Sequence, residues 1–477
     1  MLPSVPEEVI ARQSPEAQQI IRSLLAFIAS QSERLTQVQS ALEQLQQRAG
    51  ANPQNSSVPP SSVHPHAKPA AKKPKGRRKP GGQHGHPRHT RPLVPTEQCD
   101  QVVPLLPDAC RRCGGPLSGQ DPDPLRHQVY ELPEIKPIVT EYQRHRLFCP
   151  CCHDTTCAAL PPGVPSVQAG PGLVAFTAAL MAHYRQSKRC TASFLCGVFN
   201  IPASAGWVIK LQGVAAEAVA APYQELAQAL PSQPVLGLDE SPTKQAKAKA
   251  WLWTFVATTF TVFAYRLSRA ADVPRGLLGA NFAGVVMCDR AKMYWSVAGR
   301  LQWCWAHLRR DFQALIDDPD TVVKRLGHDL MRPTRQLFDL WAKCRDGTLS
   351  RAEWAEAMKP IREQIDSLLL RGLYSGSARL RGMCRELYTH RQWLWTFVEV
   401  EGVGPTNNAS ERSLRHAVIW RKLSFGTQSA RGSQFVERML TVIETCRQQK
   451  RNVLAYLSQA VRCHFAHLAP PSLLPAA

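Results

Sequence analysis

The chain has 477 residues, of which 44% are hydrophobic, and a formal net charge of +21 at pH 7. This length exceeds what one hydrophobic core serves and predicts about three domains. An excess of basic residues makes the folded state repel itself, and a polyanion, most often nucleic acid, is the usual reason to carry it. An anionic membrane surface is disfavoured as a partner, because the basic residues do not follow one face of an amphipathic helix.

The start of the chain, MLPSVPEEVIAR, lacks the basic and apolar regions of a secretory signal. The longest apolar run, residues 251–265, is too short and too rich in threonine to span a bilayer. We therefore expect the 15 cysteines to be thiols and metal ligands rather than disulfides. The expected location is the cytoplasm, with no membrane partner.

Residues 1–50 are expected to form a coiled-coil helix. Ser14 can cap a helix over 14–48, and Pro15 suits its first turn. Apolar residues then alternate three and four apart, with Gln31 as the one polar member, at Ile21, Leu24, Ile28, Leu35, Val38, Leu42 and Leu45. This stripe favours a short coiled coil and a homo-oligomer, and packing of the helix onto its own chain is the alternative.

Residues 51–98 are expected to be a basic, disordered tether. The composition is dominated by Pro, Ser, Gly, Lys, Arg and His, with almost nothing to bury. Its cations can exchange counterions on a DNA backbone, and the candidates are Lys72, Lys73, Lys75, Arg77, Arg78 and Lys79. A merely solubilising linker is the alternative, although solubility does not require positive charge in particular.

Residues 99–160 are expected to form a zinc-ribbon-like module. Two Cys-x-x-Cys pairs flank strand-like runs over 126–132 and 138–148, and a hairpin there can bring four thiolates to one zinc ion: Cys110, Cys113, Cys149 and Cys152. Four thiolates leave no open coordination position, so this zinc is expected to be structural. Redox-active pairs are the alternative.

Next, residues 161–230 contain three helical stretches, and the break at Asn200-Ile201-Pro202 is compatible with a helix-turn-helix that binds DNA.

Beyond residue 231 the pattern changes to buried strands. PVLGLDES predicts a strand that ends at Asp239 and Glu240, WLWTFVATTF and TVFAYRLS predict two more, and a helix is expected around 272–281. GVVMCDR predicts another buried strand that ends at Asp289. Acids are seldom buried without a partner, so acids at two strand ends indicate a shared cation. For either aspartate alone, a cap on the following element is the alternative.

A third acid, Glu411, begins an arginine-rich helix. With Asn408 it resembles a capping box, which is the structural alternative. The functional interpretation joins it to Asp239 and Asp289, because three carboxylates can hold two divalent metals that activate water or a 3′ hydroxyl on a phosphodiester. Magnesium, or manganese, suits an all-oxygen site. Arg412 and Arg415 would bind the phosphates on either side of the scissile bond.

Several motifs resemble the bacterial DDE transposases of the insertion sequence sixty-six family. They are NSSVPPSS (55–62), KPGGQHGH (79–86), the two cysteine pairs, LDESPT (238–243), CDRAKMYW (288–295), CWAHLRRDF (304–312), NNASERSLR (407–415) and RKLSFGTQSARG (421–432). The resemblance covers nearly the whole chain. It implies a multidomain protein with an α/β ribonuclease-H-like catalytic core over 231–430, a helical insertion at about 312–400 and a helical segment over 431–477.

The resemblance also implies roles for individual residues. The catalytic, magnesium-binding acids would be Asp239, Asp289 and Glu411, with Arg421 and Lys422 on phosphate and with Tyr294, His307 and Asn408 in support. The Cys304–His307 pair is expected to support the active-site wall and not to bind zinc, because no second pair matches it. The sequence differs from the family pattern at Arg290, where a small or neutral residue is expected after Asp289.

These features predict a transposase that binds the terminal inverted repeats of its element, cleaves them and joins the freed 3′ hydroxyls to target DNA. Double-stranded DNA is the expected partner, together with other copies of the chain and possible accessory proteins of the same element. One alternative is a zinc-containing, non-enzymatic DNA-binding regulator, which leaves the strand-end acids unused. The other is a nuclease or integrase with the same core. Magnesium-dependent nicking of element ends separates them.

Overall fold

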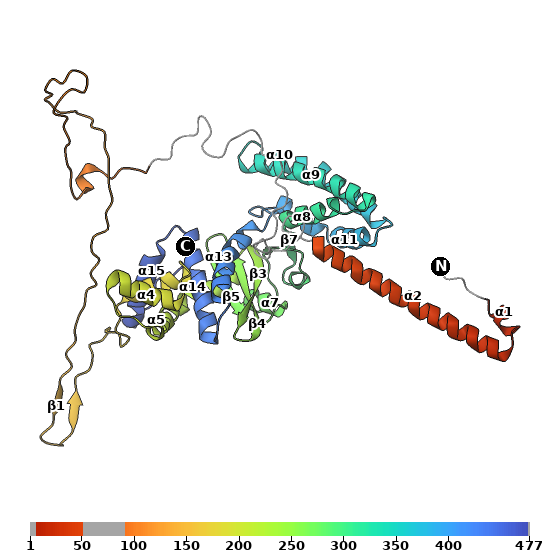
Figure 1. The fold of residues 1–477 in the computed structure, drawn as a ribbon, viewed down its shortest axis with the longest axis horizontal. Helices are drawn as coiled ribbons and strands as arrows, with labels where there is room; N and C mark the ends of the chain where they lie inside the picture. Colours follow the sequence, from red (N-terminus) through yellow and green to blue (C-terminus); the bar gives the residue numbers. More distant parts are fainter. Residues whose placement is uncertain (1–5, 51–90, 476–477) are drawn as a thin grey trace.

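The computed structural model describes residues 6–50 and 91–475 (Figure 1). Its first elements are α1 (Glu7–Ala11) and the long α2 (Pro15–Gly50). The Ser14 hydroxyl accepts the backbone N–H of Ala17 at 3.4 Å, so the predicted helix start is confirmed. On the predicted seam, Leu24, Ile28, Leu35 and Val38 are exposed, as a partner helix would require, and pairing of two such helices stays a prediction. Most of the predicted tether, including its six named cations, lies outside the described residues.

The region between the two cysteine pairs differs from the prediction. Residues 126–145, all of them described, form no strand. A hairpin of β1 (Arg146–Phe148) and β2 (Thr155–Cys157) instead surrounds the second pair. The predicted hairpin between the pairs is therefore wrong. The apolar side chains that predicted it are exposed, namely Val129, Leu132, Ile138 and Val139. An isolated pair of strands is marginal without a layer to pack against.

The predicted helical segment is confirmed as α3 (Pro171–Ala182), α4 (Lys188–Phe199), α5 (Ala205–Ala218) and α6 (Ala220–Gln228). Ser187 and Ser204 cap α4 and α5 by accepting backbone N–H groups. Asn200 ends α4 in the left-handed conformation, at a φ of 55°. Helices α3 and α5 pack against α15 (Val453–Phe465), so this segment and the C-terminal one share a core.

A five-stranded mixed sheet lies at the centre, in the order β5-β4-β3-β6-β7. Its strands are β3 (Val235–Gln245), β4 (Ala248–Val256), β5 (Thr261–Arg266), β6 (Val285–Cys288) and β7 (Arg300–Trp303). The first three are antiparallel neighbours, and β6 and β7 run parallel to β3. The prediction that the first strand ends at its acidic pair is wrong, because β3 continues to Gln245 in a hairpin with β4.

The outer edge of β5 is covered by α14 (Ala430–Gln448). Backbone N–H groups of Thr261, Phe263 and Tyr265 point outward at every second residue and donate to side chains spaced four apart along α14, namely Thr445, Thr441 and Glu437. Every second residue of the strand thus meets every fourth residue of the helix along this edge. Satisfying these N–H groups stabilises the edge and prevents pairing with another strand.

Helices connect the sheet to the last acid. Between α7 (Asp272–Leu278) and α13 (Asn408–Ser424), the predicted helical insertion is present as α8 (Trp305–Ile316), α9 (Thr321–Arg345), α10 (Arg351–Leu373), α11 (Ala378–Thr389) and α12 (Gln392–Glu399). In Figure 1, α9, α10 and α11 lie beyond the β7 end of the sheet. Helix α12 packs on β7, where Gln302 accepts the N–H of Phe397 at 2.7 Å.

Helix α13 packs across β3 and β4, and it brings a late segment of the chain onto an early strand. Its Leu414 and Ala417 pack on alternate residues of β4, Ala250 and Leu252. Trp251 and Trp253, which alternate with them along β4, face the main core on the other side of the sheet. Within 6–50 and 91–475, no helix combines the length and apolar character that a bilayer crossing demands.

Candidate active site

Two predicted acids lie side by side because of the strand register. Strand β3 pairs with β6 in parallel, and the last registered pair joins Gly237 to Met287. Two residues further along the chain from this pair come Asp239, within β3, and Asp289, just after β6, on the same edge of the sheet. The pKa of Asp239 lies well above its ordinary value of 3.8, because burial desolvates the carboxylate and because Glu240, Asp289 and Glu411 add negative charge nearby. All three predicted acids therefore share one electrostatic environment.

Glu240 is part of this environment and does not point away from it. Its side chain is only 4% exposed and accepts hydrogen bonds from the Tyr294 hydroxyl and from Arg269, the latter at 2.8 and 3.0 Å. Burial raises the pKa of Glu240, and the negative charge of Asp289 adds to that effect. The prediction of a supporting role for Tyr294 gains a physical basis, since Tyr294 is fully buried between Glu240 and Trp253.

Glu411 lies in the first turn of α13, where a helix dipole favours an anion. The capping-box alternative is wrong. Helix α13 begins at Asn408, which is exposed, and its N-cap residue is Asn407, whose side chain makes no capping hydrogen bond. The Glu411 carboxylate therefore takes no part in a capping box.

Asn407, and not the predicted Asn408, is the asparagine that organises the site. It is 2% exposed. Its side-chain amide donates to the Leu238 carbonyl at 2.7 Å, and its side-chain oxygen accepts the Ser410 hydroxyl at 2.8 Å. Its backbone N–H donates to the Cys304 sulfur at 3.2 Å. One residue therefore joins β3, the start of α8 and the start of α13 directly beside two of the acids.

A glycine permits this close approach. A Cβ atom at Gly237 would lie 2.4 Å from the Ser410 hydroxyl and 2.8 Å from the Asn407 side-chain oxygen. Real Cβ atoms do not approach other atoms so closely, and any larger residue would push the first turn of α13 away from β3. The sequence signal was a lone glycine in an apolar strand, which often marks a close backbone approach.

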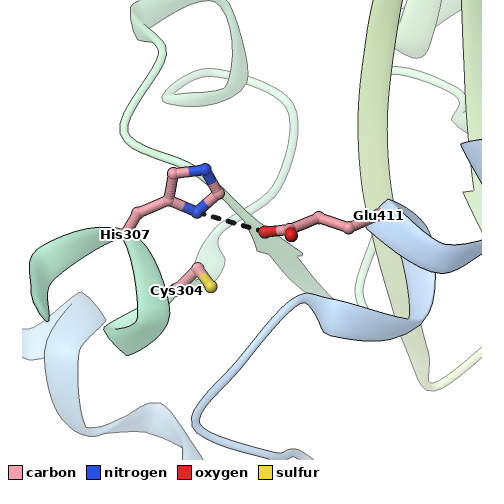
Figure 2. A group of neighbouring side chains, drawn as sticks. All are labelled: Cys304, His307 and Glu411. Carbon is pink, nitrogen blue, oxygen red and sulfur yellow. Dashed lines mark ion pairs between the residues drawn. The ribbon is translucent and has the colours of Figure 1, made fainter. Parts of the chain in front are cut away.

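The Glu411 carboxylate is directed toward α8, as Figure 2 shows. One oxygen lies 3.6 Å from His307 Nδ1, and the other lies 3.5 Å from Arg310. Among the described residues, the group whose ligand atoms lie close enough to hold one ion is Cys304, His307 and Glu411, within 4.8 Å of one another. The three acids are neighbours, but their ligand atoms do not form such a group.

Arg290, the departure from the family pattern, is directed elsewhere. It donates to Asp311 on α8 and to Glu386 on α11, both at 2.8 Å. The pKa of Asp311 is raised by burial, and the charge of Arg290 opposes that rise. Arg290 therefore ties two helices of the insertion together instead of neutralising the acid that it follows.

The predicted phosphate-binding residues fall into three groups. Arg412 and Arg415 are exposed on α13 near Glu411, and Lys422 is exposed at the end of the same helix. Arg421 instead donates to the Ser241 hydroxyl at 3.0 Å and to the Pro242 carbonyl, so it fastens α13 to β3. The six cations of the tether belong to the part that the structure does not describe.

The two cysteine pairs form matching turns. The sulfurs of Cys110 and Cys149 each accept backbone N–H groups from the residues two and three positions later, which lowers the pKa of each thiol. The residue after each pair, Gly114 or His153, has a positive φ, at 73° and 58°. Such turns suit a thiolate ligand, but in this structure the two pairs do not come together, and four-thiolate coordination stays a prediction.

Comparison with known families adds the identity of the central part. The model described as "Transposase IS66 family" matches residues 167–435, which is more than half of the chain and includes the three acids. The chain belongs to the Transposase IS66 family. A second model, described as a family of unknown function (DUF6444), matches residues 4–92.

The IS66-family chain is also similar to "Uncharacterized protein y4qI" of Sinorhizobium fredii. The two are 27% identical over 253 residues, which cover 46% of this chain and 45% of that protein. The match thus spans about half the length of this relative, which is itself uncharacterized.

Proposed function

We propose that this member of the IS66 family is a DNA transposase that binds the terminal inverted repeats of its element, cleaves a strand at each end and transfers the freed 3′ hydroxyls to target DNA. The observation that supports it most is the parallel register of β3 and β6, which sets Asp239 beside Asp289 with Glu411 in electrostatic range. A non-enzymatic regulator would have no use for three carboxylates gathered so closely that burial and the negative charge of the other acids raise the pKa of Asp239.

The sheet supports a ribonuclease-H-like core. Three antiparallel strands are followed by two that run parallel to the first, in the order β5-β4-β3-β6-β7. In this arrangement one acid lies on the first strand and one follows the fourth, while Glu411 arrives on α13 after the helical insertion. The insertion then separates the second acid from the third without disturbing the sheet.

The residues present fit hard divalent cations. Asp239 and Asp289 offer oxygen ligands at one sheet edge, where burial and the negative charge of the neighbouring acids raise the pKa of Asp239. The nearest arginine in sequence, Arg290, pairs with other acids. Asp239, Asp289 and Glu411 would hold magnesium or manganese, which supplies activation of water or a 3′ hydroxyl and stabilises the leaving oxygen.

The protein's own groups bind and orient the substrate. The exposed Arg412 and Arg415 lie on the turn of α13 that carries Glu411 and are placed to bind DNA phosphates on both sides of the scissile bond. Tyr294 and Arg269 hold Glu240 by hydrogen bonds, which fixes the segment of β3 next to Asp239. Asn407 holds the start of α13 against β3.

Other parts of the chain would bind DNA without cutting it. The α4–turn–α5 unit is a candidate reader of element ends, and the basic run over 68–91 would add contacts that depend on salt and not on sequence. One structural zinc would join the turns at Cys110–Cys113 and Cys149–Cys152. The seam on α2 would pair two copies, because both ends of an element must be brought together.

The test is cleavage and strand transfer on DNA that carries the element's ends, with magnesium or manganese. The wild-type chain should nick and join this DNA, whereas Asp239→Asn and Asp289→Asn should lose activity by orders of magnitude and keep DNA binding. DNA binding without nicking by the wild type would favour a regulator. Nicking without joining would favour a nuclease, and either result would overturn the proposal.

A further inference from the structure

We propose that Cys304, His307 and Glu411 form a site for a thiophilic divalent metal such as zinc, separate from the Cys-x-x-Cys turns. Their sulfur, nitrogen and oxygen atoms lie within 4.8 Å of one another. Cys304 and His307 lie at the start of α8, and Glu411 lies in the first turn of α13 (Figure 2). The sequence offered only the Cys304–His307 pair, and the fold supplies the third ligand.

The cysteine has the surroundings of a metal-binding turn. Backbone N–H groups of Asn407, His307 and Ala306 donate toward the Cys304 sulfur, the first at 3.2 Å. Two of these donors lie two and three residues after the cysteine, as they do at Cys110 and Cys149. The N–H groups around the Cys304 sulfur therefore repeat the pattern at Cys110 and Cys149, here at the start of a helix and with histidine in the place of the second cysteine.

The other two ligand atoms lack partners that the fold would otherwise provide. His307 Nδ1 and one Glu411 oxygen are shielded from solvent, and neither has a hydrogen-bond partner in the described part of the chain. They lie 3.6 Å apart, which is too far for a hydrogen bond. Two ligands of a tetrahedral zinc ion stand about 3.3–3.7 Å apart, as bond lengths of roughly 2.0–2.3 Å require. The spacing suits one shared ion.

The donor set selects the kind of ion. Sulfur and imidazole favour zinc, cobalt or copper, whereas the oxygen ligands of Asp239 and Asp289 favour magnesium or manganese. Three protein ligands also leave one coordination position open.

Glu411 would then belong to two metal sites. A zinc ion bound by Cys304, His307 and Glu411 would hold the Glu411 carboxylate against the start of α8, away from the ions proposed at Asp239 and Asp289. Zinc should therefore inhibit strand cleavage even when magnesium is in excess. This consequence rests on the proposed function, but metal binding itself does not.

Cobalt titration of the full-length chain tests the site without an activity assay, because a cobalt–thiolate bond has a charge-transfer absorption. Compared with the wild type, Cys304→Ser should bind one cobalt ion fewer and lose the matching share of this absorption. Glu411→Gln keeps the sulfur and should weaken the same ion by at least about tenfold. The matched control is Cys446→Ser, another buried cysteine, whose pKa burial raises to about 11.

Equal cobalt uptake and equal thiolate absorption in the wild type, Cys304→Ser and Glu411→Gln would overturn the proposal. If Cys304→Ser does not fold, as circular dichroism would show, Glu411→Gln decides the result, since this side chain is 30% exposed. Loss of cobalt in these variants supports the site even where no DNA cleavage is detected. Absence of cleavage with intact cobalt binding would count against the transposase assignment alone.

Discussion

The side-chain amide of Asn407 donates a 2.7 Å hydrogen bond to the backbone carbonyl of Leu238, the residue before Asp239. Asn407 also precedes the helix that carries Glu411. A buried polar link of this kind holds an acid-bearing strand against an acid-bearing helix, although the acids lie far apart in sequence. The arrangement of the proposed catalytic acids depends on this contact and on Gly237, which lets the start of α13 approach β3.

Asn407→Ala removes two hydrogen bonds of a buried side chain and leaves the Leu238 carbonyl without its donor. We expect the free energy of unfolding to fall by about 1–3 kcal/mol. Strand cleavage should fall further than stability explains, because Glu411 loses its position, while DNA binding persists. Asn408→Ala is the control, since Asn408 is exposed. Chemical denaturation and cleavage rates measure both effects, and equal behaviour of the two variants would contradict the positioning role.

Gly237→Ala places a methyl group where only 2.4 Å separates it from the Ser410 hydroxyl. Overpacking of this kind costs about 1–3 kcal/mol of stability. A shift of α13 by about 1 Å can lower a catalytic rate about a hundredfold. Gly276→Ala is the matched control, because a Cβ there meets open space. A fully active Gly237→Ala variant would show that the close approach is dispensable.

The pKa of Asp239 predicts how stability depends on pH and metal. In the folded chain the pKa of Asp239 is raised above 3.8. The stabilisation that comes from protonated Asp239 is therefore fully present below pH 3.8, and it is lost as the pH rises through the raised value. Without divalent ions, thermal unfolding should thus occur at lower temperature as the pH rises. Magnesium should reverse the loss, and Asp239→Asn should reduce both effects. Identical pH profiles for this variant and the wild type, with and without magnesium, would argue against a cation site.

Zinc at the paired cysteines has its own test. Replacing Cys110 and Cys149 together by serine should remove one zinc ion per chain, as metal analysis measures, and should make residues 99–160 more sensitive to protease. Cys190→Ser changes an exposed cysteine outside this region and should leave the zinc content as it was. Unchanged zinc in the double variant would mean that the two turns do not share an ion.

Periodic and local features were predictable from the sequence. The helix over 14–48 and the strands at β4, β5 and β6 agree with their apolar patterns, and the resemblance placed the helical insertion correctly. The strands expected over 126–132 and 138–145 were wrong, because alternating apolar residues specify a strand only where another layer covers them. In the structure those residues are exposed.

Contacts between distant segments were not predictable. Asn407 and Asn408 are adjacent and chemically identical, and only packing of α13 on β3 decides which one is buried. Alternation of side chains along a strand predicts that Glu240 points away from Asp239, yet Tyr294 and Arg269 reach it from later segments and bring it into the same environment. Likewise, no spacing in the sequence links Cys304 to Glu411, which meet only because α8 and α13 begin at the same edge of the sheet.

The most direct measurement is the magnesium-dependent cleavage rate of Glu411→Gln on DNA that carries the element's ends. The substitution keeps the size of the side chain, and no helix cap depends on it. We expect the rate to fall by orders of magnitude while DNA affinity stays the same or rises, because one negative charge is removed. Glu401→Gln, an exposed carboxylate that precedes α13, should cleave normally. Near-normal cleavage by Glu411→Gln would contradict the assignment of Glu411 as the third catalytic acid.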